Sequence, residues 1–338
     1  MLKSGLHKPT VYWDLYRDGV TQSSLGTFLS CPERMRLSYK EGLTPARWVG
    51  STFALDFGDL FHRGLDEIYT FWREEGSVPS FRSILNDLRD TDEAKVNVMM
   101  TEAQLYNMEI NYGFAEILLR EYLKHWKLDF GDVAWEGLEE KFDIPYASQI
   151  YPGRNIRIRG KMDGRYRIGA HNDLWLFETK TKSRIEDSII ADKLSYDLQV
   201  MVYMWALSEL VGEQVKGVKY NLIRRPGLRH GVRETTQGFL DRVRADVEGR
   251  PEHYFLRYEA ALDPHEIDRW KKDMQSIMLQ IERWFRGDFN YKNPGACGGG
   301  FVTCPYIDIC GKQDYTAFTK NKILFTELTV MQSSSEQK

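Results

Sequence analysis

The amino-acid sequence predicts an α/β fold in which a central mixed sheet is flanked by helices. Residues 174–180 form a run of apolar and β-favouring side chains, which is typical of a buried strand. In residues 155–167 the basic side chains fall at every second position, which is typical of a strand with two different faces. Residues 67–130 and 236–286 are predicted to be largely helical.

The predicted strand 174–180 carries two charged side chains on one face. Glu178 and Lys180 are two residues apart, so they point the same way. Burying such charges without a partner is costly. A second carboxylate on a neighbouring strand, for which Asp163 is the candidate, would supply a partner together with a divalent cation. Two carboxylates favour Mg²⁺ or Mn²⁺, and a lysine would steady an attacking water or a phosphate charge. An ordinary surface ion pair remains the alternative.

The predicted strand 155–167 places a row of cations on the same face as Asp163, while Ile156, Ile158 and Met162 take the opposite face. Such a row suits a phosphate backbone, although the net charge of −3 does not by itself indicate nucleic-acid binding. A solvated strand face is the alternative. The candidate DNA contacts are Arg159, Lys161, Arg165, Arg224 and Arg225.

The chain has four cysteines, one near the start and three near the end: Cys31, Cys297, Cys304 and Cys310. Four thiols with none left over meet the requirement of a [4Fe–4S] cluster or of a four-cysteine zinc site. Pro32 is placed to open a helix, which would put Cys31 at a helix N-terminus, where the dipole favours a thiolate. Two disulfides or four buried thiols are the alternatives, and disulfides would need an oxidising compartment.

These residues together resemble a known family. Asp163 followed by Glu178-Thr179-Lys180 resembles the Asp…Glu-x-Lys core of the PD-(D/E)XK nuclease superfamily. The one-plus-three cysteine layout resembles the iron–sulfur branch of the RecB-like nucleases, which includes the AddB nuclease module and the CRISPR-adaptation nuclease. The six residues between Cys297 and Cys304 are a longer interval than is usual there, so zinc stays open.

Two further segments match the same family. His62, in residues 57–65, resembles the Gly-x-x-x-His segment, in which the histidine is an additional metal ligand. Residues 195–207 are predicted to be a helix with Gln199 and Tyr203 on one face, similar to the Gln-x-x-x-Tyr motif that borders the active site and touches DNA. A core or capping histidine and an ordinary amphipathic helix are the alternatives.

The resemblance implies a restriction-endonuclease-like core with a helical insert at about 67–130 and an iron–sulfur staple that joins the N-terminal segment to residues 290–315. It implies that His62, Asp163, Glu178 and the Thr179 carbonyl hold Mg²⁺ or Mn²⁺. Lys180 would position water or stabilise charge. Gln199 and Tyr203 would hold the DNA backbone. The four cysteines would hold a structural [4Fe–4S] cluster.

The function that the resemblance implies is metal-dependent hydrolysis of DNA phosphodiester bonds, as an exonuclease in recombination, repair or the processing of phage or CRISPR DNA. A catalytically idle DNA-binding module with a structural cluster is the main alternative. An iron–sulfur redox protein is disfavoured, because no flavin or nicotinamide signature is present. A Walker motif is also absent, which excludes a helicase motor. A recombination or helicase partner and a homo-oligomer are both compatible with the resemblance.

The composition and organisation indicate a folded globule, with 42% hydrophobic and 13% aromatic residues. We expect residues 1–330 to form a single nuclease domain and residues 331–338 a disordered tail. The helical stripe of Phe114, Leu118, Tyr122 and Trp126 is expected to be core packing. No apolar run approaches a membrane span and no signal peptide opens the chain, so a cytoplasmic protein is expected.

Overall fold

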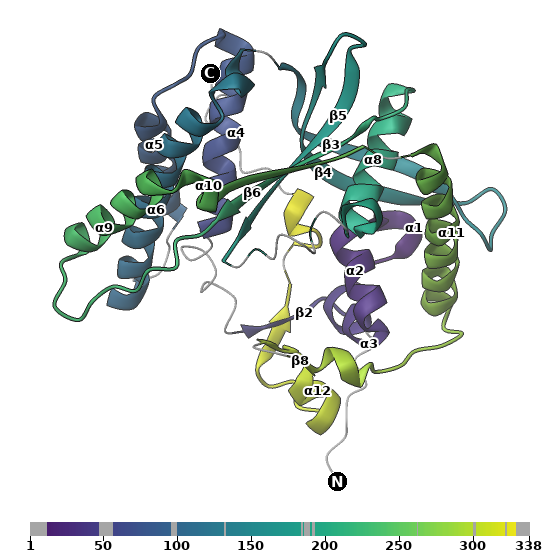
Figure 1. Cartoon of the computed structure of the whole chain (residues 1–338). Coiled ribbons are helices and arrows are strands. Elements are labelled where there is room, and N and C mark those ends of the chain that lie inside the picture. Colours follow the sequence, from purple (N-terminus) through teal and green to yellow (C-terminus); the bar gives the residue numbers. More distant parts are fainter. Residues whose placement is uncertain are drawn as a thin grey trace. The chain divides into compact units, whose positions relative to one another are not determined.

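The computed structural model in Figure 1 shows an α/β protein with two compact units. Unit 1 contains Met1–Val49, Lys141–Lys161 and His265–Lys338, and unit 2 contains Gly50–Glu140 and Met162–Pro264. The structure describes residues 12–46, 57–95, 100–131, 133–183, 185, 190, 193–261, 263–299, 302–321 and 323–328. The predicted tail 331–338 lies outside these residues.

A mixed sheet forms the centre of unit 2, as the sequence predicts. Its strands are the second part of β4 (Asn155–Ile168), β5 (Asp173–Lys182), β6 (Gly217–Arg224) and β7 (Phe255–Ala261). Strand β5 is antiparallel to β4 and parallel to β6, and β6 is antiparallel to β7. Strand β3 (Ala134–Ala147) pairs with β4.

The two predicted strands have the predicted burial. Along β4, Ile156, Ile158, Met162 and Tyr166 are buried, while the basic positions between them are exposed or half-buried. In β5 the alternation gives way to a continuous buried stretch from Leu176 to Thr179. A strand covered on both faces is buried in this way, and its polar groups then need partners inside the protein.

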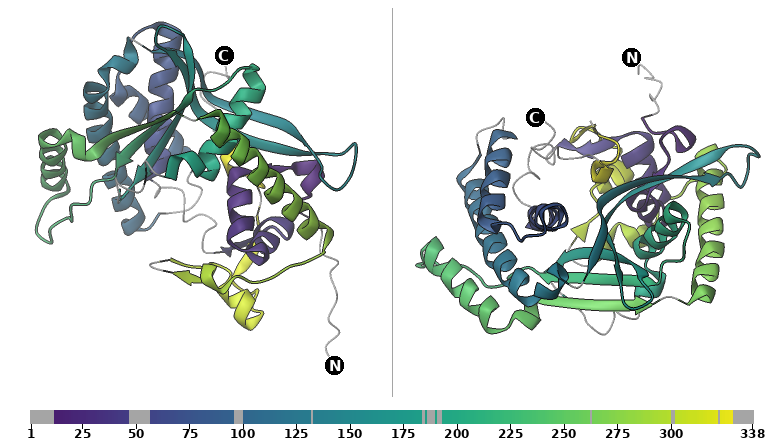
Figure 2. Two further views of the ribbon diagram at one scale, coloured as in Figure 1. Left: turned by 45° about the vertical axis from the view of Figure 1, so that its right-hand side comes forward. Right: turned by 90° about the horizontal axis from the view of Figure 1, so that it is seen from above.

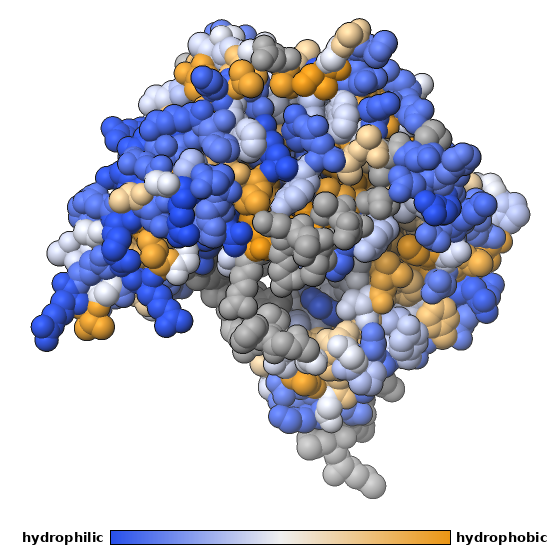
Figure 3. Space-filling model, viewed as in Figure 1, coloured by the Kyte–Doolittle hydropathy of each residue, from blue (hydrophilic) through white to orange (hydrophobic). Residues whose placement is uncertain are grey.

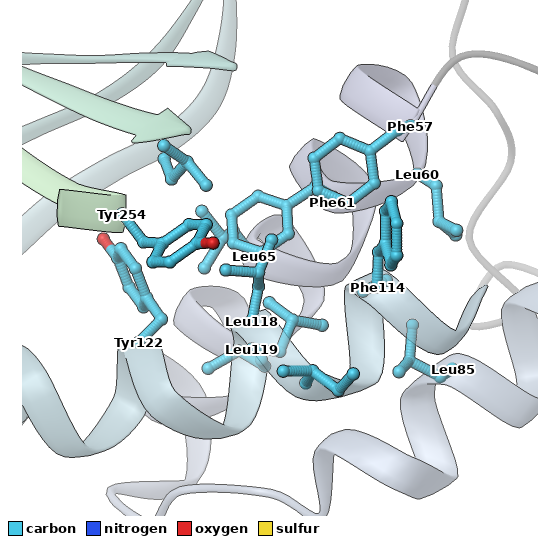
Figure 4. Packing of buried hydrophobic residues seen from close by; sticks show 14 of the residues in the cluster. Phe57, Leu60, Phe61, Leu65, Leu85, Phe114, Leu118, Leu119, Tyr122 and Tyr254 are labelled. Atoms are coloured by element: carbon cyan, nitrogen blue, oxygen red, sulfur yellow. The ribbon is translucent and has the colours of Figure 1, made fainter. Parts of the chain in front are cut away.

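Helices α4 (Phe57–Glu75), α5 (Phe81–Lys95), α6 (Glu102–His125) and α9 (Thr236–Gly249) form the helical layer of unit 2. Figure 4 shows Phe61 and Leu65 of α4 beside Leu118 and Leu119 of α6. The same cluster includes Phe177 of β5, so the layer packs on the sheet. The predicted apolar stripe of α6 is therefore core packing, and Figure 2 shows α9 beside α6.

Helix α8 (Leu198–Val211) packs against β5 and β6. It begins after Asp197, whose Oδ1 accepts the backbone N–H groups of Gln199 and Val200, both at 3.0 Å. It ends at Gly212, whose φ of 73° lies in the left-handed region that glycine tolerates. The predicted helix at 195–207 is thus present, and its first residues form a 3₁₀ turn, η4 (Leu194–Tyr196). The shorter helices of this unit are η3 (Lys127–Phe130) and α10 (Pro251–Tyr254).

Unit 1 begins with α1 (Leu15–Asp18), β1 (Val20–Thr21), α2 (Gln22–Ser30) and α3 (Pro32–Met35). A capping box between Thr21 and Ser24 starts α2, and Pro32 opens α3 directly after Cys31. The chain continues into the π-helical turn η1 (Arg36–Lys40) and β2 (Leu43–Pro45).

The C-terminal part of unit 1 starts with the long helix α11 (Pro264–Arg286). Strand β2 pairs with β10 (Phe318–Lys320), and β1 pairs with residues 158–159 of β4. The remaining elements are η5 (Pro294–Ala296), β8 (Gly298–Gly299), β9 (Val302–Thr303), α12 (Ile307–Lys312) and η6 (Thr326–Leu328).

The visible surface of the outer helices α5, α6 and α9 of unit 2 is mainly hydrophilic, with small apolar patches (Figure 3). Among the described residues, no helix is both long enough and apolar enough to cross a membrane.

Candidate active site

The carboxylate of Glu178 lies fully buried in the centre of unit 2, with 0% of its side chain exposed. Its Oε1 atom accepts a hydrogen bond from Gln199 Nε2 at 2.5 Å and lies 2.5 Å from Lys180 Nζ. Its Oε2 atom is also buried and has no hydrogen-bond partner in the part of the chain that the structure describes. A buried carboxylate oxygen without a partner is costly, which marks this atom as a place where a further positive group would be stabilised.

The electrostatics of the site follow from burial and charge proximity. Burial, followed by the charge of Asp163, raises the pKa of Glu178 to about 8, and Lys180 opposes the shift. Burial lowers the pKa of Lys180, but the charges of Glu178 and Asp163 outweigh this effect and raise it above its usual range. Lys180 is therefore an ammonium ion over the whole neutral range.

Asp163 on β4 and His62 on α4 complete the cluster. Asp163 Oδ2 accepts the backbone N–H of Thr179 at 2.7 Å and lies 3.9 Å from His62 Nδ1. The register of β4 and β5 pairs Gly164 with Phe177, so Asp163 lies beside Glu178 on the neighbouring strand. The structure thus brings together side chains that are far apart in the sequence and that the family resemblance had grouped.

Glu178, Asp163 and His62 form the candidate donor set for a divalent ion. Within the described ranges, no three His, Cys, Asp or Glu side chains already lie in a metal-ligand arrangement. The chemistry of the donors nevertheless fits a hard cation, because two carboxylates and one imidazole converge and Glu178 Oε2 is unpartnered. In this structure the positive charge beside Glu178 is the ammonium group of Lys180.

Helix α8 carries the remaining predicted site residues, Gln199 and Tyr203. Gln199 contacts Glu178 directly, as given above. Tyr203 lies one turn further along the helix and is buried, with 6% of the residue exposed. The predicted contact of these two residues with DNA stays a prediction.

Two residues near the site were missed by the sequence analysis. The charge of Asp197 contributes to the raised pKa of Glu178, and Asp197 also caps α8. Tyr220 pairs with Glu178 in the β5–β6 register, and burial raises its pKa to about 12. Asp197 has a local signal, since it is an N-cap residue before the Gln-x-x-x-Tyr helix. Tyr220 has no such local signal, because the parallel register of β5 and β6 is decided by tertiary packing.

The basic row on β4 has acidic neighbours on β3 that the sequence analysis did not include. Arg159 Nε lies 3.2 Å from Asp143 Oδ2, and Arg165 Nε lies 3.0 Å from Glu140 Oε2. These ion pairs partly neutralise the row, so its role in DNA binding stays a prediction.

The other two arginines predicted to contact DNA also have protein partners. Arg224 Nε donates to the carbonyl of His253 at 2.9 Å, and an Arg225 N–H donates to Asn111 Oδ1 at 3.2 Å. Their contact with DNA likewise stays a prediction.

All four cysteines lie in unit 1 and are free thiols. Cys31 is buried at the start of α3, and its Sγ accepts the backbone N–H of Asn293 at 3.4 Å. The Cys304 N–H donates to the Cys297 carbonyl at 2.9 Å. Burial raises the pKa of Cys310, and the charges of Glu33, Cys304 and Cys297 contribute to the same shift. The absence of a metal-ligand group noted above holds for the described cysteines as well.

Solved structures to which the chain is remotely similar include three with TM-scores below 0.5. A presumed exonuclease from Eubacterium rectale has 11% identity and a TM-score of 0.45, covering 87% of this chain and 93% of that one. A phage-related exonuclease from Haemophilus somnus 129PT has 16% identity and a TM-score of 0.29, covering 62% and 86%. A protein named SSO0001 has 12% identity and a TM-score of 0.27, covering 69% and 76%.

No curated protein matches the chain. The family model of the PD-(D/E)XK nuclease superfamily matches residues 19–311, a range that contains every candidate site residue in both units. The chain belongs to the PD-(D/E)XK nuclease superfamily.

Proposed function

We propose that this protein is a divalent-metal-dependent deoxyribonuclease, an exonuclease that hydrolyses DNA phosphodiester bonds in recombination, repair or the processing of phage or CRISPR DNA. The observation that carries the proposal is the buried Glu178 carboxylate, which has an unpartnered Oε2 and lies beside Asp163 and Lys180. Membership of the nuclease superfamily supports DNA as the substrate.

In this proposal His62, Asp163, Glu178 and the Thr179 carbonyl hold Mg²⁺ or Mn²⁺. When bound, the ion supplies Lewis acidity and lowers the pKa of a coordinated water. Lys180 keeps its proton at Nζ, which lets it donate to the attacking water or to a phosphate oxygen. Gln199 holds Glu178 Oε1 in place through its side-chain N–H, and Tyr203 lies on the same helix face for contact with the DNA backbone.

We also propose that Cys31, Cys297, Cys304 and Cys310 hold a [4Fe–4S] cluster, as in the iron–sulfur branch of the RecB-like nucleases. The contact of Cys31 with Asn293 supports this assignment, because it brings the N-terminal cysteine beside the C-terminal segment. Cys304 and Cys310 also pack against the small apolar cluster of Leu37, Leu43, Tyr306 and Ile309, which shields them. The cluster would be structural, since it ties together segments remote in the sequence, and zinc is the alternative that metal analysis distinguishes.

The test is cleavage of end-labelled linear double-stranded, linear single-stranded and circular DNA, with Mg²⁺, Mn²⁺ or a chelator. We expect metal-dependent degradation of linear DNA by the parent and almost none by Glu178→Gln, which removes the charge but keeps the shape.

The matched control is Glu259→Gln. It makes the same change on β7, at a carboxylate that is more than half exposed and pairs with Lys219 at 3.0 Å. A parent that binds DNA but never cleaves it would contradict the proposal and favour an idle DNA-binding module.

A further inference from the structure

A row of polar side chains crosses three strands of unit 2 behind the candidate active site. Thr179 of β5 pairs in register with Asn221 of β6, and Asn221 pairs with Arg257 of β7. Asn221 Nδ2 donates to Thr179 Oγ1 at 3.2 Å, and Arg257 Nε donates to Asn221 Oδ1 at 3.1 Å. Because side chains alternate along a strand, this row faces away from Glu178 and Lys180.

The row continues into the helical layer of the same unit. Arg257 makes two hydrogen bonds to the Asp129 carboxylate, at 2.7 and 2.5 Å, and one to Tyr122 Oη at 2.9 Å. Tyr122 Oη also accepts from Asn221 Nδ2 at 3.0 Å. Tyr69 Oη donates to Asp129 Oδ2 at 2.5 Å, so the helices are tied to the same set of atoms as the strands.

The network is buried throughout. Asn221 and Tyr122 are fully buried, Thr179 is 3% exposed, and the side chains of Arg257 and Asp129 are 8% and 7% exposed. Taking an ion pair out of water costs several kcal/mol per ion, and well-packed apolar side chains often stabilise a core as well or better. Stability alone therefore does not account for a charged network at this place.

The link from the network to the site is Thr179. Its side chain is held by Asn221, its backbone N–H holds Asp163 Oδ2 at 2.7 Å, and its neighbours along β5 are Glu178 and Lys180. A small rotation of this residue would move both carboxylates and the lysine together. In enzymes, displacements of about 1 Å at reacting groups cost up to about a hundredfold in rate.

We propose that Asn221 and Arg257, acting through the Thr179 hydroxyl, are positioning residues for the nuclease site, an inference that rests on the proposed function. They hold the backbone of Thr179 so that its N–H fixes Asp163 and its flanking side chains keep their orientation toward the ion. In this proposal the side chains of Thr179, Asn221 and Arg257 touch neither DNA nor the ion.

The test uses the full chain and the isosteric variant Thr179→Val, which removes the hydroxyl but keeps the backbone groups and the β-branched shape. We expect kcat to fall by about tenfold or more with the KM for DNA unchanged, and the Mn²⁺ affinity measured by calorimetry to fall as well. Thr179→Ser, which keeps the hydroxyl, should restore both quantities. Thr181→Val is the matched control, because it makes the same change two residues on, on the same face of β5 and outside the network.

Asn221→Leu is a second test variant, for which we expect the same fall in kcat and in Mn²⁺ affinity with the KM for DNA unchanged. The inference is overturned if Thr179→Val keeps both kcat and Mn²⁺ affinity within about twofold of the parent, or if Thr179→Ser is as impaired as Thr179→Val. If the parent itself does not cleave DNA, the proposed function fails. The Mn²⁺ affinities of the parent, Thr179→Val and Thr179→Ser then still decide whether the network positions the carboxylates.

Discussion

The protonation of Glu178 makes metal binding depend on pH in a defined direction. In the metal-free protein, burial and the charge of Asp163 raise the pKa of this carboxyl to about 8. A ligating carboxylate must be ionised, so an ion that binds below this pH has to displace the proton. We expect the affinity for Mg²⁺ and Mn²⁺ to rise with pH up to about 8 and then to level off.

The size of the effect follows from the position of that pKa. Well below it, the apparent affinity should change by about tenfold for each pH unit, and about one proton should be released for each ion bound. At pH 9 the release should approach zero. An ordinary imidazole has a pKa of about 6.5, so a histidine ligand would release at most about a quarter of a proton at pH 7 and less above it.

The same shift affects the stability of the metal-free protein with the opposite sign. The folded-state pKa of Glu178 lies above its ordinary value of 4.5, so the folded state holds a proton that the unfolded state has lost. The free energy of unfolding therefore falls as pH rises from about 4.5 to about 8, by at most about 5 kcal/mol. Metal should accordingly raise the melting temperature most at pH 8 and above.

The assay is calorimetric titration of Mn²⁺ at pH 7, 8 and 9 in two buffers with different ionisation enthalpies, which yields the number of protons released. Glu178→Gln is the control, because it has no proton to lose at this position. A parent protein that releases no proton at pH 7 and binds Mn²⁺ equally at all three pH values would refute the assignment of Glu178 as a buried acid that ligates the ion.

Three further outcomes are expected. Lys180→Ala should abolish cleavage while Mn²⁺ binding persists, because the lysine is not a ligand; calorimetry that shows binding lost along with activity would contradict this. Protein purified without oxygen should be brown with about four irons per chain, and Cys31→Ala should lose the iron and melt at a lower temperature; a colourless, zinc-loaded and active parent would be the contrary result. Lys161→Ala should weaken DNA binding across sequences and lower the slope of affinity against salt by about one, as measured by fluorescence anisotropy, and an unchanged slope would show a solvated face.

Local elements were predictable because their causes lie within a few residues. Helix α8 follows the N-cap residue Asp197, α2 follows the capping box of Thr21, and α3 opens at Pro32. The alternation along β4 also put Asp163 on the half-exposed face and Met162 on the buried face, as predicted. Such signals depend on the nearest neighbours along the chain.

The acidic partners of the basic row on β4 were not predictable in the same way. The row is present on β4, but Asp143 and Glu140 of β3 reach across to Arg159 and Arg165. Which charges meet depends on how two strands are aligned, and that alignment follows from the packing of their buried faces.

The sequence by itself determined that Glu178 and Lys180 share one side of a buried strand, because alternation is a local property of extended chain. Only the tertiary structure decided that Glu178 Oε2 would lack a partner and that Thr179, Asn221 and Arg257 would align in one row. Arg257 meets Asp129 across 128 residues of sequence. Contacts of this kind depend on strand register and on a core that many distant side chains build together, and no local pattern encodes them.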